Sequence, residues 1–190
     1  TIGTHLVQQL TTEASGIRIR ISNLDKETVM DALDNNRVDL VIDVRLPLKS
    51  WHVEQVLYQE TFVCVLRSDS PLTELSMEDY LMRSHILVSM RDDFQGVSDE
   101  ILKREQQSRQ VIWSTSHFMS VPFLVANSDC VALLPQRMAQ QCAKAMNLNL
   151  LPPPIEIGEF TVSMVWHQRN TNRPQHQWLR EQVIDATQNI

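Results

Sequence analysis

The sequence is poor in glycine and in paired metal ligands, and these shortages exclude several classes of enzyme. Its 4 glycines in 190 residues are too few and too scattered to build a phosphate-binding or dinucleotide-binding loop. The 6 histidines and 3 cysteines form no zinc-binding pattern, and no nucleophile-elbow motif occurs. A triad assembled from distant Ser, His and Asp residues stays open, without support from their spacing. We therefore predict that the chain is not an enzyme and holds no cofactor or metal.

Positive charge is also in short supply, and no long apolar run is present. Lys and Arg total 17 against 23 Asp and Glu, giving a net charge of −6, and the basic residues are scattered. Such a chain is a poor nucleic-acid binder by itself. No apolar run approaches the length of about 18 residues that a membrane helix needs, and no secretory signal is visible at the start. We expect a cytoplasmic protein that contacts no membrane.

The cysteines also favour a cytoplasmic protein. Cys64, Cys130 and Cys142 are odd in number, and two of them lie inside or beside apolar segments. We predict three reduced thiols in the core, and a disulfide is the minor alternative.

What the sequence does contain is a repeated pattern, a polar helix end that leads into a short apolar strand. The strands of the two copies are Val38–Ile42 and Val131–Leu134. A strand without apolar and polar alternation is typically covered on both faces by helices. The spacing is too long for a solenoid repeat and fits two similar α/β lobes. Ligands of open α/β sheets bind at the carboxyl ends of strands, so we expect a small-molecule site where two lobes meet.

Further elements follow from periodicity and capping residues. Helices are expected around residues 6–10, 25–34, 76–82, 97–102, 117–127, 135–145 and 174–184. Strands are expected at residues 17–21, 38–44, 53–57, 62–66, 86–89, 111–114, 131–134 and 160–166. Turn-forming residues 67–71 mark the first crossing between lobes.

Residues at or just beyond the ends of these strands are the candidate ligand contacts. His117 and His167 each follow a strand, and Phe118 offers an aromatic wall beside the first of them. The structural alternative is that each imidazole only caps a backbone group. The segment Ser89-Met90-Arg91 can collect an anion, although it can equally be a solvated loop in which Arg91 pairs with neighbouring carboxylates. With Asp43, the predicted set for a small aromatic or otherwise planar anion is Asp43, Ser89, Met90, Arg91, His117, Phe118 and His167.

Several motifs together resemble a known family. Residues 36–42 (NRVDLVI), 62–66 (FVCVL) with Ser70-Pro71-Leu72, 115–118 (TSHF), 132–135 (ALLP), 165–167 (VWH) and 177–180 (QWLR) resemble the effector-binding domain of LysR-type transcriptional regulators. The later motifs are most similar to the branch with salicylate-responsive regulators and flavonoid-responsive nodulation regulators. The match extends over essentially the whole chain.

The resemblance implies two Rossmann-like lobes of the type 2 periplasmic-binding-protein kind, joined by two crossover strands. Lobe I would be residues 1–66 plus 162–190, and lobe II residues 67–161. In salicylate-responsive members, histidines that match His117 and His167 meet the ligand. The family's domain also begins with a strand that Thr1 follows, and its winged helix-turn-helix is absent from this sequence.

The family further implies a homodimer, a tetramer in the full-length protein, and DNA binding only through the missing amino-terminal domain. We expect an isologous interface to draw on Leu6, Val7 and Leu10 or on the helix with Val29, Met30 and Leu33. The alternative function is a solute-binding protein that delivers substrates to a transporter. The effector itself is not specified by the sequence.

Overall fold

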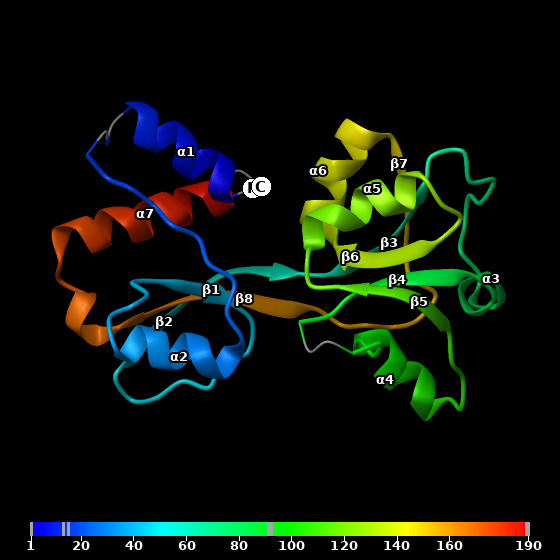
Figure 1. Ribbon diagram of the computed structural model, residues 1–190, viewed down its shortest axis with the longest axis horizontal. Coiled ribbons are helices and arrows are strands. Elements are labelled where there is room, and N and C mark those ends of the chain that lie inside the picture. The colour runs from blue at the N-terminus through cyan, green and yellow to red at the C-terminus, as the bar shows by residue number, and fades with distance from the viewer. Residues whose placement is uncertain (1, 13, 15, 91–92, 189–190) are drawn as a thin grey trace. The chain divides into compact units, whose positions relative to one another are not determined.

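The chain consists of two compact units in the computed structural model, which describes residues 2–12, 14, 16–90 and 93–188 (Figure 1). Unit 1 comprises Thr1–Gln59 and Phe160–Ile190, and unit 2 comprises Glu60–Glu159. The chain leaves unit 1 inside a long extended stretch, where only Thr61 separates β2 (His52–Glu60) from β3 (Phe62–Arg67). It returns where β8 (Phe160–His167) begins. The boundary predicted between residues 66 and 67 lies after the observed division between Gln59 and Glu60. The prediction used turn-forming residues, which mark the end of a strand, whereas the two units are divided by how their residues pack.

Unit 1 is a sheet with helices on both faces. Its strands follow the order β1-β8-β2, and β1 (Val41–Asp43) runs antiparallel to β8. On one face, α2 (Lys26–Asp34) packs against Val165 of β8. On the other face, α1 (Ile2–Thr12) and α7 (Pro174–Gln188) cover Met164 and Trp166 (Figure 1). Because successive strand residues point to opposite faces, β8 contributes apolar side chains to both cores.

The expected strand at Ile17–Ile21 does not form in the described structure. This segment is extended, but it belongs to no sheet. The strand prediction is wrong, because alternating isoleucines form a strand only beside a neighbour with which to share backbone hydrogen bonds. The described part of unit 1 offers it none.

Unit 2 contains a larger mixed sheet with the strand order β5-β4-β6-β3-β7. Strand β4 pairs parallel with both β5 and β6, whereas β3 pairs antiparallel with β6 and β7. Its remaining elements are α3 (Met77–Met82), β4 (Ser84–Val88), α4 (Val97–Arg104), β5 (Gln110–Thr115), η1 (Phe118–Ser120), α5 (Val121–Ala126), β6 (Val131–Pro135), α6 (Gln136–Met146) and β7 (Leu148–Leu151).

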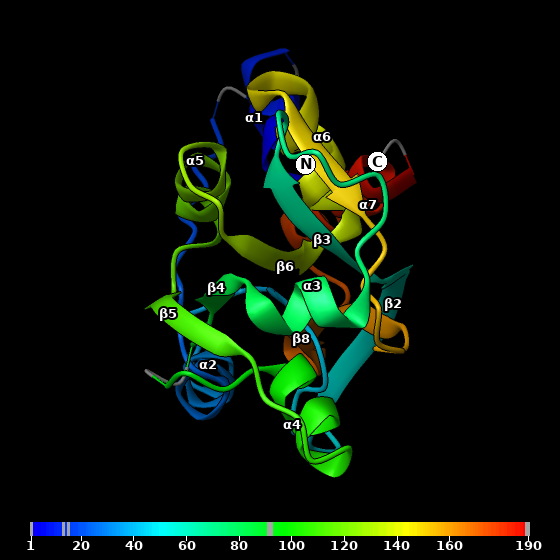
Figure 2. The same ribbon diagram turned by 90° about the vertical axis from the view of Figure 1, so that its right-hand side faces the viewer.

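The apolar strands of unit 2 are covered on both faces, as the sequence predicted. Along β3, Val63 and Val65 face the core under α5 and α6, while Cys64 and Leu66 face the core that contains Tyr80 of α3. Figure 2 shows this sheet after a turn of 90° about the vertical axis of Figure 1. Strand β7 was not predicted, because Pro152 and its neighbours follow it at once and its four residues show no alternation.

Local signals explain how several helices begin. The Ser76 hydroxyl accepts a hydrogen bond from the backbone N–H of Asp79 at 3.0 Å, which caps α3 as expected. Pro122 lies in the first turn of α5, where a missing N–H does no harm. At the start of α4, a Cβ on Gly96 would lie 2.7 Å from Leu87 Cδ1, so close packing requires glycine there.

The cysteine prediction is confirmed, since Cys64, Cys130 and Cys142 are all free and buried. Burial raises the pKa of the Cys64 thiol to about 12, which makes it unreactive at neutral pH. In the described ranges, no helix is both long and apolar enough to cross a membrane.

Candidate functional site

The candidate site in unit 2 lies at the carboxyl ends of the parallel strands β4 and β5. Val88 pairs with Thr115 at the last position of the ladder, and the Ser89 N–H donates to the Thr115 carbonyl at 3.0 Å. The residues that follow each strand therefore emerge side by side. The structure brings four predicted residues to one edge of this unit, namely Ser89, Met90, His117 and Phe118.

The Ser89 side chain is already engaged at this edge. It is buried, and its hydroxyl donates to Asp93 Oδ1 at 2.6 Å. The loop that carries Asp93 is held to β5 by a second bond of 2.6 Å, from the Ser114 hydroxyl to the Asp93 carbonyl. A ligand carboxylate would compete with Asp93 for the Ser89 proton. Arg91 lies outside the described residues.

His117 lies at the start of η1. Its N–H donates to Thr115 Oγ1 at 3.1 Å, and its carbonyl accepts from both the N–H and the hydroxyl of Ser120. Its imidazole is exposed and makes no capping bond to η1, so the structural alternative does not account for this side chain. Within the described ranges, the N–H groups of Phe118 and Met119 also donate to no acceptor.

Large apolar side chains are exposed around the same edge. Of the 15 large hydrophobic residues that are exposed in the described chain, 8 lie between Met90 and Phe123. Those nearest the strand ends are Met90 at 46%, Phe94 at 60%, Phe118 at 39% and Met119 at 59% exposure.

In unit 1, Asp43 and His167 lie at opposite ends of the β1–β8 ladder. Asp43 pairs with Ser163, which is four residues from His167, or roughly 13 Å along an extended strand. The Asp43 carboxylate accepts from the N–H of Val44 at 2.6 Å. Unit 1 therefore does not bring these two predicted residues together.

The His167 imidazole is held by contacts within unit 1. Its Nδ1 accepts from the Arg169 N–H at 3.2 Å, and its ring meets the ring of His52 edge to face at 6.2 Å. Partial burial, together with the charge of Arg169, lowers the pKa of His167. The lowered pKa favours the neutral imidazole, whose Nδ1 accepts the Arg169 N–H, in line with the structural alternative for this residue.

A buried polar network that was not predicted from the sequence lies at the amino ends of β4 and β5. Arg109 donates two bonds to Asp99, at 2.9 and 2.8 Å, one to the Tyr80 hydroxyl at 3.1 Å and one to His85 Nδ1 at 3.3 Å. The His85 Nε2–H donates to the Tyr80 carbonyl at 2.6 Å. Burial lowers the pKa of His85 to about 4, so the imidazole is neutral at pH 7. This network connects α3, β4, α4 and β5 and so fixes the strands that carry the site.

Thr115 is the site residue that sequence reasoning missed. Its carbonyl and hydroxyl hold Ser89 and His117 in place. Its position as the last residue of a strand was the available signal. Among the described residues, no cluster of His, Cys, Asp and Glu could hold a metal ion.

Comparison with known proteins places these observations in a family. The model of the LysR substrate binding domain matches residues 2–188. The chain is 28% identical over 160 residues to the HTH-type transcriptional activator NahR of Pseudomonas putida, which covers 83% of this chain and 53% of NahR. It is 28% identical over 159 residues to the HTH-type transcriptional regulator SyrM of Rhizobium meliloti, covering 81% and 48%. The chain thus spans about half the length of these relatives.

Solved structures agree on the fold. The regulatory domain of MexT, a transcriptional activator in Pseudomonas aeruginosa, has a TM-score of 0.81 at 26% identity, covering 96% of this chain and 90% of that one. The CcmR regulatory domain of Synechocystis PCC6803 in complex with 2-PG has a TM-score of 0.76 at 14% identity, covering 100% and 92%. The fold is therefore that of LysR effector-binding domains, related to type 2 periplasmic binding proteins. The named relatives are transcriptional regulators. The chain belongs to the family of LysR substrate-binding domains.

Proposed function

We propose that this chain is the sensing domain of a cytoplasmic transcriptional regulator and that it binds a small aromatic or otherwise planar organic anion. The observation that supports this proposal is the edge of unit 2 where Ser89, Met90, His117 and Phe118 follow the paired strands β4 and β5. The edge combines exposed apolar side chains with the exposed side chain of His117.

The chemistry of this edge fits a planar carboxylate. The His117 imidazole and the N–H groups of Phe118 and Met119 are donors that a carboxylate can use. Phe118 and Met90 can cover an aromatic ring. Ser89 joins as a donor when its hydroxyl leaves Asp93. Asp43 and His167 remain predictions that this edge does not include.

The wider assignment follows from the relatives. NahR and SyrM are named as helix-turn-helix regulators, and this chain matches about half the length of each. We infer that a DNA-binding domain is carried elsewhere on the full protein, that the protein is a homodimer, and that it catalyses no reaction. Effector binding would then shift a conformational equilibrium and so change the geometry of the DNA-binding domains.

The burial of residues on α1 and α2 reduces the number of side chains that can form the proposed dimer interface. Val29, Met30 and Leu33 of α2 are buried in the core of unit 1, so they are not available to a partner. On α1, Leu6 is buried, whereas Val7 is 60% exposed. Val7 is therefore the residue to substitute in a test of dimerisation by sedimentation.

Calorimetric titration with salicylate, as a representative planar carboxylate, tests the site. If His117 donates a charge-assisted hydrogen bond, His117→Ala weakens binding by about 1.5–3 kcal/mol, or roughly ten-fold to a hundred-fold. Unchanged affinity in His117→Ala, or no binding of salicylate and related benzoates at millimolar concentration, contradicts the proposal.

Two methionines provide a matched control. Met90 follows β4 and Met82 precedes it, and both side chains are exposed, at 46% and 78%. Met90→Ala should weaken salicylate binding several-fold, while Met82→Ala should leave it unchanged. Equal effects of the two substitutions would place the ligand elsewhere.

A further inference from the structure

The edge of unit 2 that we propose as the effector site contains a carboxylate of its own. The Ser89 hydroxyl donates to Asp93 Oδ1 at 2.6 Å, and the Gln95 N–H donates to the same oxygen at 3.4 Å. Ser89 is 8% exposed and Asp93 is half-buried, so this pair is largely shielded from water. A hydrogen bond to a carboxylate is roughly twice as strong as one between neutral groups. The Ser89 hydroxyl therefore already has an anionic acceptor.

The backbone on both sides of this bond is held by other hydrogen bonds. The Ser89 N–H donates to the Thr115 carbonyl at 3.0 Å, which joins the ends of β4 and β5. The Ser114 hydroxyl donates to the Asp93 carbonyl at 2.6 Å, which attaches the Asp93 backbone to β5. The bond between the Ser89 hydroxyl and the Asp93 carboxylate can therefore break by rotation of side chains, while the main chain stays in place.

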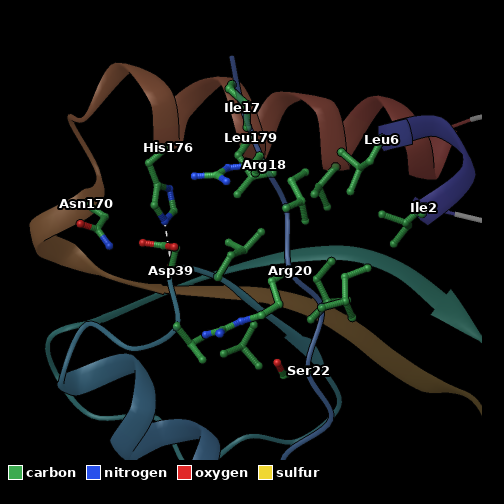
Figure 3. Close-up of a pocket in the computed structure, with 18 of the residues that line it drawn as sticks. Ile2, Leu6, Ile17, Arg18, Arg20, Ser22, Asp39, Asn170, His176 and Leu179 are labelled. Carbon is green, nitrogen blue, oxygen red and sulfur yellow. Dashed lines mark hydrogen bonds between the residues drawn. The ribbon is translucent and has the colours of Figure 1, made fainter. Parts of the chain in front are cut away.

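A bond of the opposite kind is present in unit 1. Beside a cavity of about 730 Å³, the His176 Nε2–H donates to the backbone carbonyl of Asp39 at 2.8 Å (Figure 3). That carbonyl can turn away only if the main chain moves, because the peptide unit is planar. The acceptor at the unit 2 edge is a side-chain carboxylate, which turns about its own torsions. A second acceptor can therefore replace the Asp93 carboxylate far more easily.

We propose that Asp93 is a built-in competitor of the effector, an inference that rests on the proposed function of this edge. The Asp93 carboxylate offers Ser89 the same chemical group that a planar organic anion offers. The effector has to displace this carboxylate and has to approach its negative charge. The apparent affinity is lowered by the fraction of molecules in which Ser89 is still bound to Asp93. Asp93 therefore sets the effector concentration at which the domain responds.

Calorimetric titration of salicylate into the original protein and into Asp93→Ala tests the proposal. Loss of the competing carboxylate should strengthen salicylate binding by roughly ten-fold to a hundred-fold, the value of a hydrogen bond to a charged group. If Asp93 only supported the loop, its removal would loosen the edge and weaken binding. The two roles of Asp93 therefore predict opposite signs. Unchanged or weaker binding in Asp93→Ala overturns the proposal.

Asp93→Asn removes the charge and keeps the shape of the side chain. Its amide oxygen can still accept from Ser89 and Gln95, which preserves the local structure, and salicylate binding should still become stronger. Asp69→Asn is the matched control, because Asp69 is also a loop carboxylate and its side chain is 71% exposed. Asp69 follows β3, which ends at the opposite end of the sheet from β4, since β6 is antiparallel to β3 and parallel to β4. Equal gains of affinity in the two variants would assign the effect to net charge and contradict the proposal.

The neutral analogue salicylamide shows whether the gain depends on the anion. Salicylamide has the shape of salicylate without the carboxylate charge, so the Asp93 carboxylate does not repel it. It also offers Ser89 a weaker acceptor than a carboxylate does. The ratio of salicylate affinity to salicylamide affinity should therefore rise several-fold in Asp93→Ala. An unchanged ratio would mean that the substitution only opens space, and it would overturn the proposal.

A second substitution identifies the shared hydroxyl. In the original protein, salicylate replaces one carboxylate acceptor of Ser89 by another, so only part of the new hydrogen bond adds to the affinity. In Asp93→Ala the whole bond adds, so Ser89→Ala should weaken salicylate binding about ten-fold more in that background. Equal effects of Ser89→Ala in the two backgrounds would show that the two carboxylates do not compete for Ser89, and would overturn the proposal.

Two results separate failure of this proposal from failure of the proposed function. Salicylate binding that depends on His117 and is equally strong in the original protein and in Asp93→Ala would keep the effector site and overturn the competitor alone. If salicylate and related benzoates bind neither protein at millimolar concentration, the effector site is contradicted, and the competitor is overturned with it.

Discussion

The two units respond differently to the same sequence pattern. In each, a helix ends in polar residues and leads into a short apolar strand, which is β1 in unit 1 and β6 in unit 2. Strand β6 lies inside its sheet, between β4 and β3, whereas β1 is at an edge. In unit 2, β5 pairs in parallel with β4, whereas the extended segment 17–24 of unit 1 pairs with no described strand. A strand-forming pattern therefore becomes a strand only where a neighbour completes its hydrogen bonds.

The polar clusters of the two units differ in how deeply they are buried. In unit 1, Asp34 accepts bonds of 2.7 Å from Lys49, Trp51 and His52 near the surface, and the bond from Lys49 contributes most to lowering the pKa of Asp34. In unit 2, the side chain of Arg109 is 1% exposed. Since water can replace a lost partner only at the surface, we expect substitutions in the buried network to cost far more.

The largest expected effect is at the centre of the unit 2 network. Arg109→Met leaves the carboxylate of Asp99 without its charged partner and two further groups without a donor, which should lower the free energy of unfolding by about 3–5 kcal/mol. Urea denaturation measures this loss. Adding Asp99→Asn to Arg109→Met should recover part of it, because a neutral amide costs less to leave unpaired. A loss below about 1 kcal/mol would show that burial of this network matters little.

The next effect is a pH dependence that comes from His85. Burial lowers the pKa of its imidazole from 6.5 to about 4, so between these values the unfolded chain binds a proton that the folded chain does not. The stabilisation is complete above pH 6.5 and is lost as the pH falls toward 4, by about 3 kcal/mol in all.

Unfolding free energies measured by urea denaturation at intervals between pH 7 and pH 4 follow this loss. His85→Gln can keep both a donor and an acceptor without titrating, so it should flatten the profile in that range. A variant profile as steep as that of the original protein would assign the dependence to other groups.

The smallest expected effects compare one glycine in each unit. A Cβ on Gly96 meets Leu87 at 2.7 Å, so Gly96→Ala should destabilise unit 2 by about 1–2 kcal/mol. A Cβ on Gly3 in α1 meets no atom within 4 Å, so Gly3→Ala should stabilise unit 1 by a few tenths of a kcal/mol up to about 1 kcal/mol, through helix propensity. Thermal unfolding of the two variants checks both signs. The same sign for both substitutions would contradict the packing described for Gly96.

Local signals in the sequence were sufficient for most elements and for part of the site. Ser76 correctly indicated the start of α3, because capping acts within a few residues, whereas the helix predicted at residues 117–127 divides into η1 and α5. The apolar run of β6 correctly indicated a strand buried on both faces. Ser89 and His117 could be placed at one edge, because each follows a strand in a parallel arrangement.

Only the tertiary structure decided which of these residues meet. The register of β1 and β8 separates Asp43 from His167, and no local pattern encodes that register. The network of Tyr80, His85, Asp99 and Arg109 joins residues up to 29 positions apart. The extended segment that begins at Ile17 has the sequence of a strand and pairs with nothing described. Propensity and capping depend on neighbours along the chain, whereas strand pairing and burial depend on neighbours brought together by the fold.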